Sequence, residues 1–192
     1  MNTGKDMTNE TRRSPVDALI DSASRSAAEL GLHDLSLLQK VGVQGPNVAA
    51  WLSERELPWP QSIYALARLD DGALIVRIAE NEVVIESSDE SGLPPKLAEI
   101  PALRAAGVYG VEQQTATFRL DGPTAAGVWA QTCGVNIVES AIDRLCYTRV
   151  AGVSCGIIPQ QGGGERAYRI WVDYGYAPYL WKTLVTISSE LL

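Results

Sequence analysis

Hydrophobic and polar residues alternate along much of this chain with the period of a β-strand, and shorter stretches follow the period of a helix. The order of these stretches predicts β-α-β-β-α-β, which is typical of a ferredoxin-like unit. After a first helix that begins near Ser14-Pro15 and ends at Gly31, the first half contains strands at 35–44, 63–69, 73–78 and 108–113, an edge strand at 82–86, and helices at 46–56 and 96–106.

The second half repeats most of this order. Its pattern predicts strands at 115–120, 145–159 and 166–173, and helices at 123–133 and 177–192. A unit of this size buries too little apolar surface to be robust alone, so we expect the two to share a core. The expected fold is α/β (α+β): two interlocked ferredoxin-like units with antiparallel sheets. We expect a disordered tail at 1–13, a first helix and unit over 14–110, and a second unit over 111–192.

One local motif occurs in both halves. A strand leads to Gly-Pro, at 45–46 and again at 122–123, and each pair precedes a small apolar helix that carries Trp51 or Trp129. Proline is favoured at the first helical position because the N–H that it lacks has no partner there. The motif predicts a duplicated strand–turn–helix.

Charge and cysteine content argue against several classes of function. With a net charge of −7 and one adjacent basic pair, Arg12-Arg13, the chain lacks the clustered cations that nucleic acids require. No apolar run approaches the roughly 20 residues that span a bilayer. The first residues lack the apolar core of a signal peptide, and the three cysteines show no CxxC spacing. We expect a cytoplasmic protein with reduced thiols and no membrane partner.

None of the residues that could carry chemistry forms a recognisable site. His33 is the only histidine, which favours a helix-terminal or surface role. The glycines at 162–164 lack the lysine and helix of a phosphate loop and indicate a flexible hairpin tip. Asp70-Asp71 precede Gly72, which marks a turn rather than a catalytic pocket. We therefore expect no catalytic, cofactor-binding or metal-binding residue in this chain.

Aromatic residues gather near the C-terminus. Five of them fall within eleven residues: Trp171, Tyr174, Tyr176, Tyr179 and Trp181. Large aromatic rings with a polar group are enriched at protein interfaces, and they also pack final strands and helices onto a core. Strand alternation allows both, with some rings inward and others outward.

The second Gly-Pro pair is a further candidate contact. Gly122 and Pro123 begin a helix, whose free N–H groups attract either an N-cap or an anionic group. Together with the five aromatic residues, they are our candidates for contact with a partner chain.

Several short runs resemble the gamma subunit of heterotetrameric sarcosine oxidase. They are FRLDGP (118–123), AQTCGVN (130–136), TRVAGV (148–153) and YLWKTL (179–184), and the segments 14–16 and 43–45 also suit that family. Each run is short, and the resemblance depends on their order and spacing over most of 14–190. That family is related to the glycine-cleavage aminomethyltransferases and folate-binding proteins, which implies the same repeated fold.

The resemblance implies a place in a four-subunit flavoenzyme that oxidatively demethylates N-methyl amino acids or related amines. Alpha, beta and delta subunits would be the partners, and FAD, FMN, NAD, tetrahydrofolate and zinc would be held by them and not by this chain. This chain would help the complex to assemble and would shape the cavity for folate and the one-carbon unit, without catalysing a step. Gly72 is followed by Ala73-Leu74-Ile75, so the catalytic aspartate of the aminomethyltransferases has no counterpart.

Two alternatives stay open. The chain could be a stand-alone folate-dependent one-carbon transferase, which would require it to bind folate by itself and to place an acidic residue in the pocket. It could also be a folate-binding regulatory or assembly protein, which would bind folate without turnover.

Overall fold

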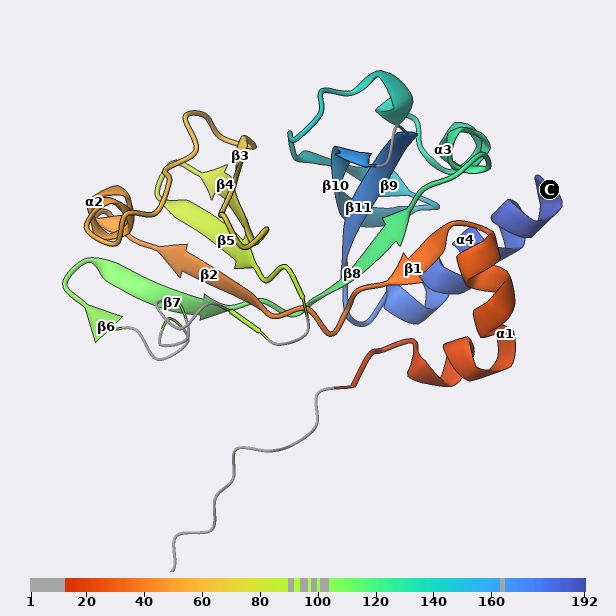
Figure 1. Cartoon of the computed structure of the whole chain (residues 1–192), viewed down its shortest axis with the longest axis horizontal. Helices are drawn as coiled ribbons and strands as arrows, with labels where there is room; N and C mark the ends of the chain where they lie inside the picture. Colours follow the sequence, from red (N-terminus) through yellow and green to blue (C-terminus); the bar gives the residue numbers. More distant parts are fainter. Residues whose placement is uncertain (1–12, 90–91, 94–96, 98–99, 101–103, 163–164) are drawn as a thin grey trace, which may run out of the picture.

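The computed structural model describes residues 13–89, 92–93, 97, 100, 104–162 and 165–192. Over these residues the chain forms two antiparallel sheets that lie face to face, with helices on their outer sides (Figure 1). The α+β fold with two ferredoxin-like units is therefore confirmed. The predicted disordered tail, 1–13, lies outside the described residues except for Arg13, and so does most of the glycine tip at 162–164.

The first sheet has six strands in the order β3-β4-β5-β2-β7-β6. Their bounds are Lys40–Gln44 (β2), Leu66–Arg68 (β3), Leu74–Ala79 (β4), Glu82–Glu86 (β5), Arg104–Ala105 (β6) and Val108–Glu112 (β7). The central strands β4, β5, β2 and β7 are the second, third, first and fourth of a ferredoxin-like unit. The short strands β3 and β6 extend this sheet at its two edges, and α2 (Val48–Ser53) follows β2.

The second sheet has five strands in the order β1-β8-β11-β10-β9. Their bounds are Leu32–Asp34 (β1), Thr115–Leu120 (β8), Cys146–Val150 (β9), Val153–Gly162 (β10) and Glu165–Asp173 (β11). The helices α3 (Ala125–Thr132) and α4 (Ala177–Glu190) belong to this half, with a short 3-10 helix at Ile137–Glu139. Strand β1 takes the edge beside β8, which is the place of the fourth strand of a ferredoxin-like unit.

The N-terminal segment packs with the second half of the chain. The first helix, α1 (Asp17–Glu29), leads into β1, where Leu32 lies opposite Leu120 of β8. The Asp121 amide donates a hydrogen bond of 2.8 Å to the Gly31 carbonyl. The sequence placed this helix with the first unit over 14–110, because a pattern along the chain does not show which sheet a strand joins. We propose residues 14–34 and 113–192 as one unit and 40–112 as the other.

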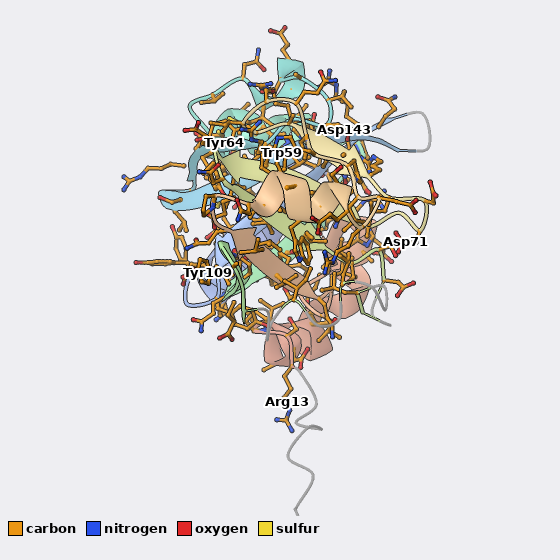
Figure 2. The ribbon with its side chains drawn as sticks, turned by 90° about the vertical axis from the view of Figure 1, so that its left-hand side faces the viewer. Arg13, Trp59, Tyr64, Asp71, Tyr109 and Asp143 are labelled. Atoms are coloured by element: carbon orange, nitrogen blue, oxygen red, sulfur yellow. The ribbon has the colours of Figure 1, made fainter. Side chains whose placement is uncertain are left out.

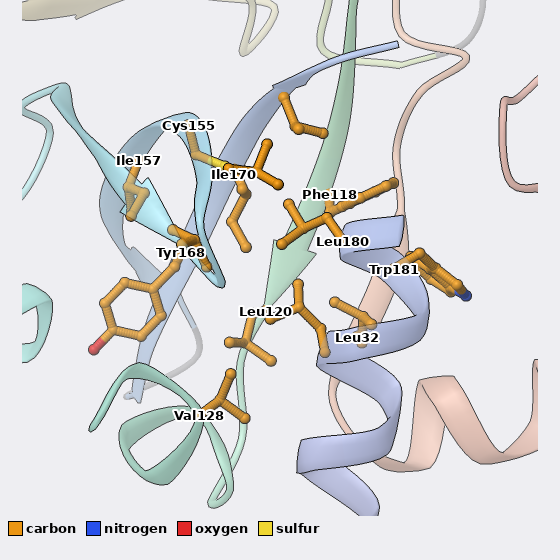
Figure 3. Close-up of a cluster of buried hydrophobic side chains, with 14 of the residues drawn as sticks. Leu32, Phe118, Leu120, Val128, Cys155, Ile157, Tyr168, Ile170, Leu180 and Trp181 are labelled. Carbon is orange, nitrogen blue, oxygen red and sulfur yellow. The ribbon is translucent and has the colours of Figure 1, made fainter. Parts of the chain in front are cut away.

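The central strands of each sheet bury side chains on both faces, because successive residues of a strand point to opposite sides. The outer face of the first sheet packs against α2 through Val41, Val43, Leu52 and Ile85. The outer face of the second sheet packs against α1, α3 and α4, with Phe118, Leu120, Ile170, Leu180 and Trp181 at the centre of the cluster (Figure 3). The inner faces meet in a third cluster: Leu74, Val76 and Val84 from the first sheet, and Leu145, Ile158 and Trp171 from the second.

The duplicated strand–turn–helix is confirmed. Gly45 and Gly122 both have positive φ, at 132° and 77°, directly before the proline. The prolines are not at the first helical position, because α2 and α3 begin two residues later, at Val48 and Ala125, after the N-caps Asn47 and Thr124. Trp51 and Trp129 are buried in the outer cores of their respective units. The predicted hairpin turn at 70–72 is also present, because Gly72 has φ of 88° between β3 and β4.

Three predicted strands are wrong in extent. The strand predicted at 63–69 covers only Leu66–Arg68 (β3). The predicted strand 145–159 is a hairpin of β9 and β10, because Ala151 and Gly152 both take positive φ, at 49° and 84°, as a tight turn requires. The predicted strand 35–44 keeps only its second half, β2, because the chain crosses from one sheet to the other at residues 35–39. The Ser36 amide donates to the Asp34 carboxylate at 3.0 Å and begins this crossing.

The predicted helix 96–106 is wrong at its C-terminal end. Arg104 and Ala105 pair with Tyr109 and Val108, so they form a strand that turns at Gly107 (φ 70°). Leu97 and Ile100 are buried in the first outer core, and the other residues of 96–103 lie outside those described.

The N-terminal attachment can be tested at Gly31. This residue has φ of 74°, and a Cβ there would lie 2.1 Å from the Asp121 carbonyl oxygen. Gly152 has a similar φ of 84° with nothing within 4 Å, so it is a matched control. Urea unfolding should show that Gly31→Ala lowers the free energy of unfolding by about 2–4 kcal/mol and Gly152→Ala by about 1 kcal/mol. Equal losses would contradict close packing of β1 on β8.

Candidate subunit interface

The residues with catalytic potential do not come together. Over the described residues, no group of three histidine, cysteine or acidic side chains could hold a metal ion. His33 is half-exposed, with its Nε2 3.7 Å from an Asp121 oxygen. All three cysteines are unpaired, and burial, with a smaller effect of Cys133, raises the pKa of Cys155 to about 12. None of the described helices combines the length and apolar character needed to cross a membrane.

Two of the predicted contact residues are covered by the chain itself. Trp171 and Trp181 are only 4% and 3% exposed. Trp171 lies between the two sheets, and Trp181 packs edge-on against Phe118 with ring centroids 5.0 Å apart. Both rings therefore stabilise this chain, and a partner could reach neither without displacing it.

The tyrosines around the start of α4 are more accessible. Tyr176 and Tyr179 are 58% and 53% exposed, and Tyr174 is partly buried. The Tyr179 hydroxyl donates to the Ala151 carbonyl at 3.1 Å, and that of Tyr174 donates to the Arg13 carbonyl at 3.3 Å. Tyr176 and Tyr179 therefore present rings whose contact with a partner stays a prediction.

The second Gly-Pro pair also lies at the surface. Pro123 is exposed, and a Cβ on Gly122 would meet nothing within 4 Å. The next residue, Thr124, donates its hydroxyl to the Leu30 carbonyl at 3.2 Å and so joins the start of α3 to the end of α1. Contact of Gly122 and Pro123 with a partner stays a prediction too.

The structure adds an exposed apolar surface that the sequence did not indicate, formed by Ile63, Tyr64 and Tyr147; we call it the tyrosine surface. The rings of Tyr64 and Tyr147 meet edge-on, with centroids 5.8 Å apart. Tyr64 belongs to the segment before β3, and Tyr147 to β9, so the surface joins both units. Figure 2 shows Tyr64 and the exposed Tyr109 on the same side of the molecule.

Tyr64 holds an unfavourable backbone conformation at this surface. Its φ of 70° is rare for a bulky residue and costs energy that the surroundings must offset. The Tyr64 amide donates to the Arg77 carbonyl at 2.6 Å, and its carbonyl accepts from the Leu145 amide at 2.8 Å. Backbone strain of this kind is concentrated at functional sites, which makes Tyr64 a candidate contact residue.

Cations hold the segment that carries Tyr64. The Arg77 guanidinium stacks on the Trp59 ring at 4.5 Å and donates to the Pro60 carbonyl at 3.4 Å. From the second unit, Arg144 donates to the Ser62 hydroxyl at 3.3 Å and to the Ile63 carbonyl at 3.4 Å. The tyrosine surface is thus fixed by side chains of both units before any partner binds.

Behind these surfaces, a buried ionic cluster joins the sheets. Glu86 has no solvent exposure and accepts hydrogen bonds of 2.8 Å from both the Thr117 hydroxyl and the Trp171 indole. Arg169 pairs with its other oxygen, and the Lys40 ammonium lies 3.6 Å away. Burial alone would raise the pKa of Glu86, but Lys40, Arg169 and the Thr117 hydrogen bond together hold it below its usual value.

Comparison with solved structures finds the same fold in a chain of the heterotetrameric sarcosine oxidase from Corynebacterium sp. U-96, determined in complex with pyrrole 2-carboxylate. The two chains are 18% identical, with a TM-score of 0.75, and the match covers 94% of this chain and 96% of that chain. No model of a known protein family matches this chain. No curated protein matches it either. The resemblance to a subunit of this kind of oxidase is therefore confirmed at the level of the fold.

The ionic cluster makes stability depend on pH. Because the pKa of Glu86 is lowered by folding, its contribution is present above the unfolded value of about 4.3 and is lost as pH falls through the folded pKa. At pH 7, Glu86→Gln should cost about 3 kcal/mol, since it removes the buried negative charge that compensates Lys40 and Arg169. In urea unfolding, the difference from the wild type should shrink between pH 7 and pH 3.

Glu82 provides the control for this prediction. It lies on the same strand, and burial raises its pKa, so its charge opposes folding at neutral pH. Glu82→Gln should leave stability at pH 7 unchanged or slightly higher. A loss for Glu86→Gln no larger than for Glu82→Gln would contradict the assigned role of the cluster.

Proposed function

We propose that this chain is a non-catalytic, gamma-type subunit of a heterotetrameric flavoenzyme similar to sarcosine oxidase. The complex would oxidatively demethylate N-methyl amino acids or related amines. This chain would help assembly and shape the cavity for folate and the one-carbon unit. Its partners would be the alpha, beta and delta subunits, and FAD, FMN, NAD, tetrahydrofolate and zinc would reside in them.

One observation carries this proposal: a chain of a heterotetrameric sarcosine oxidase has the same fold over nearly its whole length, with 94% and 96% of the two chains matched. A match over nearly the whole length of both chains favours an equivalent subunit over a domain shared with an unrelated protein. The short sequence runs at 118–123, 130–136, 148–153 and 179–184 resemble the gamma subunit of that family in their order and spacing. Fold likeness alone does not fix function, so the exposed surfaces must supply the test.

The tyrosine surface is the contact that we assign to a partner subunit. It exposes large rings that their own chain already orders, which lowers the entropy lost on binding. Tyrosine is enriched among the residues that contribute most to binding at interfaces. The strained backbone at Tyr64 supports this assignment over Tyr176 and Tyr179, for which no such constraint is present.

Co-expression tests the proposal directly. A tagged form of this chain, produced together with alpha, beta and delta subunits of a sarcosine-oxidase-like complex, should co-purify with them in equal amounts and in a complex that oxidises sarcosine or a related N-methyl amine. A chain that stays monomeric beside these subunits would contradict the proposal. A monomer that binds tetrahydrofolate in calorimetry would favour the one-carbon transferase or the regulatory protein instead.

Paired variants test the assigned surface. Tyr64→Asn with Tyr147→Ser removes both rings, and asparagine tolerates the positive φ at residue 64. This pair should weaken association with the partner subunits by about tenfold or more. Tyr64→Phe with Tyr147→Phe keeps the rings and should retain assembly. Thermal unfolding of each isolated chain checks folding, and full assembly by a folded ring-deleted pair would exclude this surface.

A further inference from the structure

A pocket on the line where the two units meet is lined by arginine and amide side chains. It has a volume of about 280 Å³, and its polar lining consists of Arg68, Ser88, Arg119, Gln160, Gln161 and Arg169. We call it the arginine pocket. Arg68 and Ser88 come from the first unit, and the other four come from β8, β10 and β11 of the second. No aspartate or glutamate is among the described residues that line it.

Two of the arginines face each other on neighbouring strands. Arg169 of β11 lies directly opposite Arg119 of β8, and His33 of β1 lies opposite Arg119 on its other side. Like charges in directly opposed positions destabilise a sheet. Each arginine of the pocket has one carboxylate contact outside the lining: Arg68 with Asp143, Arg119 with Asp121, and Arg169 with Glu86. These contacts leave other N–H groups of the same side chains unpaired.

The buried groups without hydrogen-bond partners are concentrated at this pocket. Six buried side-chain N or O atoms lack a partner among the described residues, and three of them belong to its lining: Nε of Arg119, Nε of Arg169 and Nε2 of Gln160. All three are donors. Gln160 is only 8% exposed. A buried donor without a partner costs about 1–3 kcal/mol, and an acceptor that enters the pocket and reaches these groups would recover that cost.

We propose that the arginine pocket binds a small oxyanion, a carboxylate or phosphate group of a soluble molecule. Guanidinium and amide N–H groups match the oxygens of such groups in geometry and charge. The volume suits a small anion or one end of a larger molecule.

Nuclear magnetic resonance of the full chain tests this site without partner subunits, so its outcome is separate from that of the proposed function. Sodium phosphate and sodium succinate are titrated in turn, with sodium chloride at matched ionic strength as the reference. The Nε–H signals of Arg119 and Arg169 should shift and saturate with at least one of the two anions. The anion whose titration saturates at the lower concentration, phosphate or succinate, shows whether the pocket prefers a phosphate or a carboxylate group.

Variants of the chain show whether the shifts of the Nε–H signals arise from binding in this pocket. Arg119→Gln should weaken binding by about tenfold or more, since it removes a charge-assisted donor. Arg68→Gln, at an exposed position, should weaken binding as well and serves where Arg119→Gln does not fold. Arg149→Gln, exposed on β9 and outside the lining, should bind as the wild type does. Shifts equal to those with chloride, or affinity unchanged in both pocket variants, would overturn the proposal.

Discussion

The carboxylate of Glu86 lies between the two sheets with no solvent exposure. The arrangement of the whole chain depends on the groups that neutralise and hydrogen-bond this buried negative charge. Its partners come from both units: Lys40 from the first, and Thr117, Arg169 and Trp171 from the second. Buried charge is costly unless it is paired and hydrogen-bonded, whereas apolar contacts tolerate sliding. The apolar cluster between the sheets thus supplies attraction, and the ionic cluster fixes their relative position. Trp171 contributes to both, through its ring and through its indole N–H.

The path of the chain strengthens this coupling. The chain passes from the second sheet to the first at residues 35–39 and returns at 113–114, so neither unit is a continuous segment. Because β1 fills the edge beside β8, the second unit would lack a strand without the N-terminal residues. The bridge between Ala65 and Arg144 adds a third connection at the tyrosine surface. The term interlocked, which the sequence supported only through the small size of each unit and a family resemblance, has this concrete meaning in the structure.

The sequence predicts the local elements well and their assignment to sheets poorly, for physical reasons. Strands β5 and β8 have the predicted bounds, because clear alternation and turn residues enclose them. The predicted edge position of β5 is wrong, since this strand lies between β4 and β2. The hairpin between β9 and β10 is missed because Ala151, a residue with no turn preference, takes positive φ. The burial of Trp171 and the meeting of Tyr64 with Tyr147 depend on contacts between distant segments. A one-dimensional pattern shows that a side chain points away from one core, but not whether a second core, a partner or water receives it.

The layered arrangement also restricts where this protein can bind anything. Helices cover the outer faces of both sheets, and the inner faces cover each other, so little sheet surface is left for a ligand or a partner. Binding surfaces must then lie where the two units meet at the surface, or on the exposed sides of the helices. The tyrosine surface and the arginine pocket both lie along that line, and each takes residues from both units. Their geometry therefore depends on the relative position of the sheets that Glu86 fixes. A change at this buried carboxylate would alter both surfaces without touching either.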